Sequence, residues 1–159
     1  MRKRTKRGRI YAATSPLNYV IDGVRATPEK LLDDLRLREL AAIEMFAAGS
    51  AGLQEWVDVN GMHTLSETMA RGGVGPEALE ACEAAQEVLI RAAKQFEATK
   101  KMSVKPEGLD AMRELFAFHD AQRQAVSRGE YERWIEKALR RVRSKAPEVV
   151  DIGEVSASA

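Results

Sequence analysis

A sharp corner between two helices is the strongest structural signal in this sequence. Ser127 is followed three residues later by Glu130, which is the spacing of a capping box. In this motif the hydroxyl accepts an N–H of the new helix, and the carboxylate accepts the N–H of the capping residue. Val126 before the cap and Tyr131 after it are placed to form a hydrophobic staple. The sequence therefore predicts that one helix ends near Val126 and another begins at Arg128.

Proline and glycine divide the rest of the chain into helical segments. Proline is favoured in the first turn of a helix, and glycine just beyond its last turn. On this basis we expect helices at 16–22, 28–48, 50–70, 76–99, 106–126 and 128–146. The composition of 45% hydrophobic, 31% charged and 6% aromatic residues is that of a soluble helical domain. We therefore predict an all-α fold, a single-domain bundle of five to six helices with a basic N-terminal arm and a short acidic C-terminal tail.

The two ends of the chain carry opposite charge. We divide it into a disordered basic arm at 1–9, a helical domain at 10–146 and a flexible acidic tail at 147–159. The cations of the arm are Arg2, Lys3, Arg4, Lys6, Arg7 and Arg9. A basic arm on a nearly neutral body is typical of proteins that touch nucleic acid. The alternative is a solvated tail that aids solubility.

The sequence also indicates the cellular compartment of the protein. No apolar run approaches the ~20 residues that a membrane span requires. The basic start is not followed by the apolar region of a signal peptide. The single cysteine, Cys82, excludes an internal disulfide and suits a reducing compartment. We therefore expect a cytoplasmic protein with no membrane partner.

The predicted helix at 50–70 has an apolar face that turns polar along its length. Leu53, Trp56 and Val57 begin this face. The same face then carries Asn60, His63, Thr64 and Glu67. If the polar row is buried, it must form a satisfied hydrogen-bond network. If it is exposed, it lines a cleft or an interface, with Trp56 as a natural anchor.

A second polar cluster lies before the corner and contains His119, Asp120, Gln122 and Arg123. Arg123 can hold a carboxylate or a phosphate with two parallel bonds, which makes His119 and Arg123 candidates for contact with a partner. The other interpretation, which we prefer, is that Arg123 pairs with a buried glutamate such as Glu39 or Glu67 and locks the bundle. Glu39 fits that role because it falls in the middle of the apolar arc of its own helix.

No pattern of residues predicts catalysis, a metal site or a cofactor. His63 and Glu67 have a spacing that metals use, but no framed ligand set such as CxxC or HExxH is present. The GGVGP turn at 72–76 lacks the lysine of a phosphate-binding loop. Cys82 lies on an apolar stripe and is expected to be an inert buried thiol. We therefore predict a protein that is not an enzyme.

Three segments resemble small uncharacterised proteins that phages and integrated mobile elements of Gram-negative bacteria carry. They are RELAAIEMFAAG at 38–49, ETMARGGVGPEALEACEAAQ at 67–86 and FHDAQRQAVSRGEYE at 118–132. The resemblance implies a mobile-element accessory protein that inhibits or remodels a host protein complex. A nucleic-acid-handling defence complex is the expected target, in the manner of an anti-CRISPR. On this hypothesis the partner-binding residues are Trp56, Asn60, His63, Glu67, His119 and Arg123.

Two other functions remain open. One is a DNA- or RNA-binding regulator that uses the basic arm together with a second group of cations in the last helix. That group consists of Arg140, Arg141 and Arg143. The other is a structural homo-oligomer, a helical dimer whose interface is the apolar stripe from Leu79 to Phe96. Nucleic acid and a second copy of the chain are thus the alternative partners.

Overall fold

The computed structural model describes residues 28–144, which form five α-helices and no strand. The helices are α3 (Glu29–Ala47), α4 (Leu53–Arg71), α5 (Ala78–Thr99), α6 (Pro106–Ala125) and α7 (Arg128–Arg143). The prediction of an all-helical bundle is confirmed for this part of the chain. The predicted helix at 16–22, the basic arm at 1–9 and the acidic tail at 147–159 lie outside the described residues.

The predicted corner between α6 and α7 is present, with both bonds of the capping box. The Ser127 hydroxyl accepts the Glu130 N–H at 3.2 Å, and the Glu130 carboxylate accepts the Ser127 N–H at 2.9 Å. Tyr131 is buried directly after the cap. The start of α4 differs from the prediction, because Gly52 and not Ser50 is the N-cap. The reason is that the Glu55 carboxylate accepts the Gly52 N–H at 2.8 Å, which makes Gly52, three residues before Glu55, the residue that precedes the first turn of α4.

Two glycines set how the chain turns and how α7 packs. Gly49 has φ 70°, a left-handed conformation that ends α3 at little steric cost. Gly72 follows α4, and a Cβ atom there would lie 2.1 Å from the ring of Trp134. Only glycine therefore lets α7 approach the end of α4 this closely.

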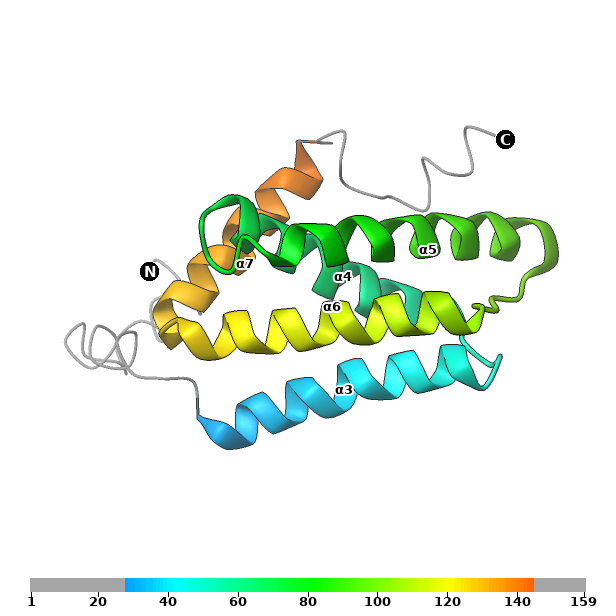
Figure 1. The fold of residues 1–159 in the computed structure, drawn as a ribbon, viewed down its shortest axis with the longest axis horizontal. Coiled ribbons are helices and arrows are strands. Elements are labelled where there is room, and N and C mark those ends of the chain that lie inside the picture. Colours follow the sequence, from blue (N-terminus) through cyan, green and yellow to red (C-terminus); the bar gives the residue numbers. More distant parts are fainter. Residues whose placement is uncertain (1–27, 145–159) are drawn as a thin grey trace, which may run out of the picture.

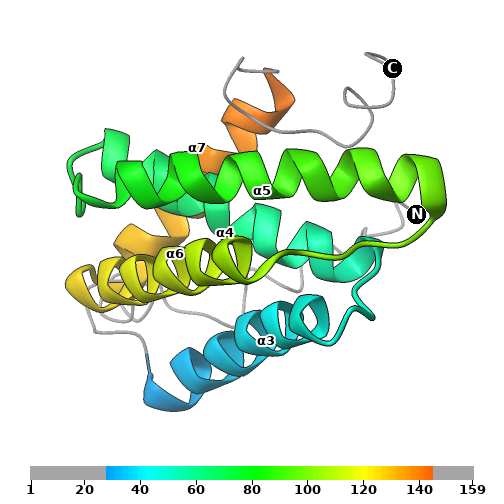
Figure 2. The same cartoon turned by 45° about the vertical axis from the view of Figure 1, so that its right-hand side comes forward.

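The helices pack around α4, which contacts each of the other four. Figures 1 and 2 show α3, α6 and α5 side by side, with α4 behind them and α7 crossing at one end. α3 and α6 are antiparallel, so the start of α3 and the end of α6 lie at the same end of the bundle (Figure 1). That end also holds the α6–α7 corner. The core between the helices is apolar, with Ile43, Phe46, Val59, Leu89, Met112 and Leu115 among its buried members.

Two predicted apolar faces sit differently in the structure. Leu53 and Val57 were expected to face inward, yet they are 46% and 47% exposed, because the buried side of α4 is centred on Trp56 and Val59. The stripe that was proposed as a dimer interface lies inside the single chain. Cys82, Leu89 and Ala93 are all buried in the core, so the middle of this stripe is not available to a second copy, while Leu79 and Phe96 at its ends are half-buried.

Candidate functional site

The polar residues that the sequence singles out are gathered inside the bundle rather than on its surface. His63, Glu67, His119 and Arg123 are buried, and Asn60 is half-buried. Trp56 is 2% exposed, and its indole N–H donates to the Leu89 carbonyl at 2.9 Å. The prediction of these six residues as a partner-binding surface is therefore corrected. They form part of the interior, and Trp56 cannot anchor an interface.

An ion pair between α3 and α6 forms the first of two buried polar groups. The Arg123 guanidinium donates to both carboxylate oxygens of Glu39, at 2.9 Å and 2.7 Å. The Arg123 side chain is fully buried, with 0% exposure. This is the locking role that the sequence favoured for Arg123, with Glu39 as its partner. Burial raises the pKa of the Glu39 carboxyl, and the charge of Arg123 opposes this rise.

Asp120 extends this group toward the surface. Its carboxylate accepts a bond from Arg36 Nε at 2.9 Å and one from Arg123 at 3.3 Å. Burial acts to raise the pKa of Asp120, but the bond from Arg36 and the charge of Arg123 outweigh it and hold the pKa below its usual value. The result is a chain of alternating charges that crosses from α3 to α6.

His119 lies beside this ion pair and is neutral. Its Nε2 atom lies 3.4 Å from the Tyr131 hydroxyl of α7. Burial, reinforced by the positive charge of Arg123, lowers the pKa of His119 to about 3. A neutral imidazole therefore faces the tyrosine at the point where α6 and α7 meet.

The second buried polar group joins α4 to α7. Arg141 donates to the Glu67 carboxylate at 3.2 Å and to the Thr68 hydroxyl at 2.6 Å. Arg71 donates to the other oxygen of the same carboxylate at 2.9 Å. Burial lowers the pKa of His63, one turn away, and the negative charge of Glu67 acts against this. The polar row on α4 therefore faces inward, Thr64 donates to the Asn60 carbonyl within α4 at 2.9 Å, and Glu67 is the member of the row that binds α7.

Gln122 and Ser66 join α4 to α6 between the two groups. The Ser66 hydroxyl donates to the Gln122 side-chain oxygen at 2.7 Å, and the Gln122 amide donates to the Val74 carbonyl at 2.8 Å. Ser66 is not among the candidate residues predicted above, although it lies seven residues after Val59 and so on the buried face. Cys82 is close by, with its sulfur 3.7 Å from the Ser66 hydroxyl, and burial raises its pKa to about 11. Its thiol is therefore protonated at neutral pH and a poor nucleophile.

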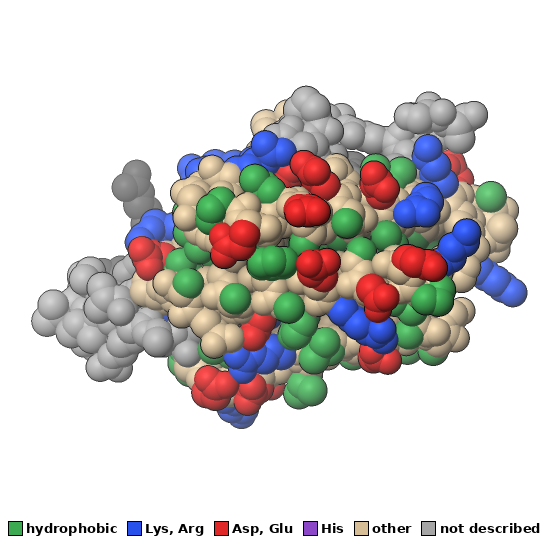
Figure 3. All heavy atoms as spheres, viewed as in Figure 1, with side chains coloured by type: hydrophobic (Ala, Val, Ile, Leu, Met, Phe, Trp, Pro, Cys, Tyr) green, Lys and Arg blue, Asp and Glu red, His purple; other side chains and the backbone are tan. Residues whose placement is uncertain are grey.

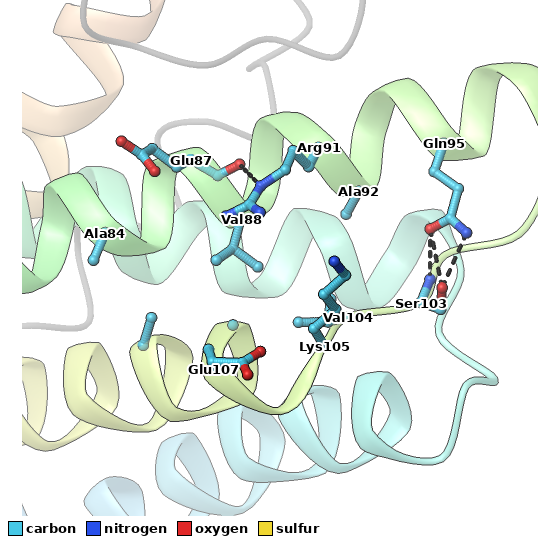
Figure 4. A pocket seen from close by; sticks show the side chains of 12 residues that line it. Ala84, Glu87, Val88, Arg91, Ala92, Gln95, Ser103, Val104, Lys105 and Glu107 are labelled. Atoms are coloured by element: carbon cyan, nitrogen blue, oxygen red, sulfur yellow. Dashed lines mark hydrogen bonds between the residues drawn. The ribbon is translucent and has the colours of Figure 1, made fainter.

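A shallow hollow of about 450 Å³ lies between α5 and α6 (Figure 4). Its floor includes Val88, Ala92 and Val104, and charged side chains such as Glu87 and Arg91 line it. Gln95 binds Ser103 at one end, through the Ser103 N–H at 2.9 Å. None of the residues predicted for a site lines this hollow. Acidic side chains are spread over the same side of the molecule (Figure 3).

The residues of the last helix that were predicted to bind nucleic acid differ in their exposure to solvent. Arg140 and Arg143 are exposed, whereas Arg141 is half-buried and bound to Glu67 and Thr68. Arg141 therefore has a structural role, and its guanidinium is engaged inside the fold. The six cations predicted for the arm, at positions 2–9, lie outside the described residues.

Comparisons with protein-family models, with curated proteins and with solved structures found no match to this chain. Within residues 28–144 no group of three or more histidine, cysteine, aspartate or glutamate side chains is placed to hold a metal ion. None of the described helices combines the length and the apolar character that crossing a membrane requires.

Proposed function

We propose that this chain is a non-enzymatic mobile-element protein that binds and inhibits or remodels a host protein complex, and that α7 makes the contact. The observation that carries this proposal is a stripe of cations along the outside of α7. Arg133, Lys137 and Arg140 are spaced by four and three residues, so they share one side of the helix, where exposed Glu136 lies beside them. All three are exposed, and Arg143 is exposed nearby. We call these four residues the basic stripe.

The basic stripe is held out by the packing of α7. Lys137 is 4.8 Å from the ring centroid of Trp134, a cation–π distance that keeps its ammonium group near the helix surface. On the other side Arg141 is drawn into the fold by Glu67. Of the four cations, Lys137 is therefore the one that a contact within α7 orders, and it has less side-chain entropy to lose on binding.

A protein partner fits the charges of this domain better than nucleic acid does. The chain as a whole has a sequence pI near 7.9, whereas domains that bind nucleic acid usually have a pI above ~9. The exposed carboxylates of α5 and α6 would repel a phosphate backbone that extended beyond the stripe. They are Glu80, Glu83, Glu87, Glu107, Asp110 and Glu114. A short acidic patch on a protein meets the stripe without meeting them. The host complex and its role in defence come from the resemblance of the three sequence segments above.

Affinity capture from a host lysate treated with nuclease, followed by binding of the purified captured complex, tests this proposal. The charge-reversed variant Arg133→Glu with Arg140→Glu should lose the complex while its helical circular dichroism is unchanged. Its matched control is Lys94→Glu with Lys101→Glu, which makes the same charge change at exposed positions of α5 and its end. Equal binding by the two variants would contradict the proposal.

A second candidate is direct binding of DNA or RNA, supported by the exposure of Arg140 and Arg143 and by the cations at 2–9. Fluorescence anisotropy with a labelled duplex separates it from the first. Binding that weakens steeply with salt, and whose salt slope becomes shallower when Arg140→Ala and Arg143→Ala are introduced, would favour nucleic acid. Binding of the captured complex that withstands nuclease would favour the protein partner.

A further inference from the structure

Both histidines of the chain are buried where α7 meets the bundle. The sequence contains two histidines, His63 on α4 and His119 on α6, and they are 1% and 0% exposed. The Tyr131 hydroxyl of α7 lies 3.4 Å from His119 Nε2. His63 lies one turn before Glu67, which binds Arg141 of α7 at 3.2 Å. Each histidine therefore adjoins a contact that α7 makes with the rest of the fold.

α7 is the described helix that the rest of the bundle holds least. Only Tyr131 and Ala138 of its 16 residues are buried, fewer than in any of the other four described helices. α3, α4, α5 and α6 each pack on at least two of one another, whereas α7 packs mainly on α4, across one end of the bundle (Figures 1 and 2). An element with few buried contacts opens at a lower free energy than the whole domain unfolds. α7 can therefore leave while the other four helices stay folded.

The surroundings of His63 keep its ring neutral while α7 is docked. The groups near it that carry charge or titrate come from three helices. They are Glu67 and Arg71 on α4, Cys82 on α5 and Arg141 on α7. Burial lowers the pKa of the ring, and this effect is larger than the opposing effect of Glu67. The Glu67 carboxylate is itself engaged by two arginines, at 2.9 Å and 3.2 Å.

His119 is held neutral in the same way. The charged or titratable groups around it are Glu39 on α3, Asp120 and Arg123 on α6, and Tyr131 on α7. The Glu39 Oε1 atom lies 4.0 Å from His119 Nε2, but both oxygens of this carboxylate accept bonds from Arg123. Burial, together with the charge of Arg123, lowers the pKa of His119 to about 3. A proton on either ring therefore opposes the docked position of α7.

We propose that α7 is a pH-sensitive element, which acid releases from the bundle because the two buried histidines take up protons once α7 has left. In the released state each ring reaches water, where the pKa of histidine is about 6.5. The released state therefore binds protons that the docked state excludes, and a fall in pH favours release. Between pH 7 and pH 5 the equilibrium constant for release rises ~25-fold if one histidine takes up a proton, and up to ~600-fold if both do. Because α7 also carries the basic stripe, release would change the surface offered to a partner, and this consequence alone rests on the proposed function.

Thiol labelling of the full-length chain tests the proposal. Cys82→Ser removes the native thiol, and Ala138→Cys then places a thiol on the buried side of α7, at a position that is 7% exposed. Ala93→Cys is the matched control, because Ala93 is 1% exposed in the core of α5 and reports on unfolding of the whole domain. The reagent is a pyridyl disulfide, used at pH 7 and at pH 5. Each rate is divided by the rate of the same variant unfolded in urea at the same pH.

We expect position 138 to react faster than position 93 at pH 7, and its normalised rate to rise about 25-fold or more between pH 7 and pH 5. Combining His63→Gln with His119→Gln should reduce this rise to less than about threefold, with the helical circular dichroism unchanged. If the double variant does not fold, the two single variants are measured, and each should show a smaller rise than the parent.

Three outcomes would overturn the proposal. Equal normalised rates at positions 138 and 93 would mean that α7 leaves only when the whole domain unfolds. A rise below about tenfold at position 138 in the parent would mean that neither histidine takes up a proton on release. A full rise that persists in the folded double variant, or in both single variants, would assign the pH dependence to other groups.

Discussion

Removing one partner of the buried Arg123–Glu39 pair is the sharpest test of the interior. Arg123→Met keeps much of the aliphatic volume but leaves the Glu39 carboxylate, which is 12% exposed, without its two charged bonds. Breaking a buried pair in this way costs about 3–5 kcal/mol. The total free energy of unfolding of a domain of this size is about 5–15 kcal/mol. The variant should therefore lose a large share of its stability.

Urea unfolding followed by circular dichroism at neutral pH measures this loss. The matched control is Arg113→Met, which breaks an exposed pair with Glu44 at 3.2 Å, with side chains 47% and 65% exposed. Exposed pairs contribute about 0–1 kcal/mol, so the control should be close to the parent. The double variant Glu39→Leu with Arg123→Met should be more stable than Arg123→Met alone, because it leaves no buried charge without a partner. A cost below about 1 kcal/mol for Arg123→Met would refute the reasoning, since it would mean that Glu39 reaches water.

Three further predictions concern buried groups and the α4–α7 contact. The pKa of His119 is lowered to about 3, so the unfolded chain binds the proton before the folded chain does. The contribution of His119 to stability is therefore full above pH ~6.5 and falls as the pH drops toward 3. Between pH 7 and pH 5 the melting temperature of His119→Gln should fall less than that of the parent chain. Cys82, with a pKa near 11 and 1% exposure, should resist a thiol reagent at pH 8 in the native protein and react fully in urea. Gly72→Ala should lower the melting temperature and shift tryptophan fluorescence, since its Cβ would meet Trp134 at 2.1 Å, whereas Gly61→Ala has open space and should stabilise by up to ~1 kcal/mol.

Local signals in the sequence were enough to predict most of the helix boundaries. The capping box at Ser127 and Glu130 can be recognised from the sequence alone, because all its atoms lie within four residues. The same is true of the proline that starts α6 at Pro106. The start of α4 was predicted a few residues early, since Ser50 resembles a cap as closely as Gly52 does and the choice depends on Glu55.

The position of the polar residues could not be predicted in the same way. Whether Trp56 and His63 face inward depends on which side of α4 meets α5, α6 and α7, and these are contacts between segments distant in sequence. Leu53 and Val57 show the difficulty, because they are as apolar as any core residue and yet are exposed. A helical period identifies residues that share a face, but only the neighbouring helices decide whether that face is covered.

The buried polar residues have one property in common that explains their place in the fold. Glu39, His119 and Arg123 lie where α3 and α6 meet the start of α7, and Glu67 holds Arg141 further along the same helix. Apolar contacts would allow α7 several similar positions, whereas directional bonds to buried charges favour one. The network therefore fixes the direction of α7, and with it the side of the bundle on which the basic stripe is exposed. Two residues that the sequence assigned to a partner surface, Glu67 and His119, thus contact the helix that carries the exposed charges.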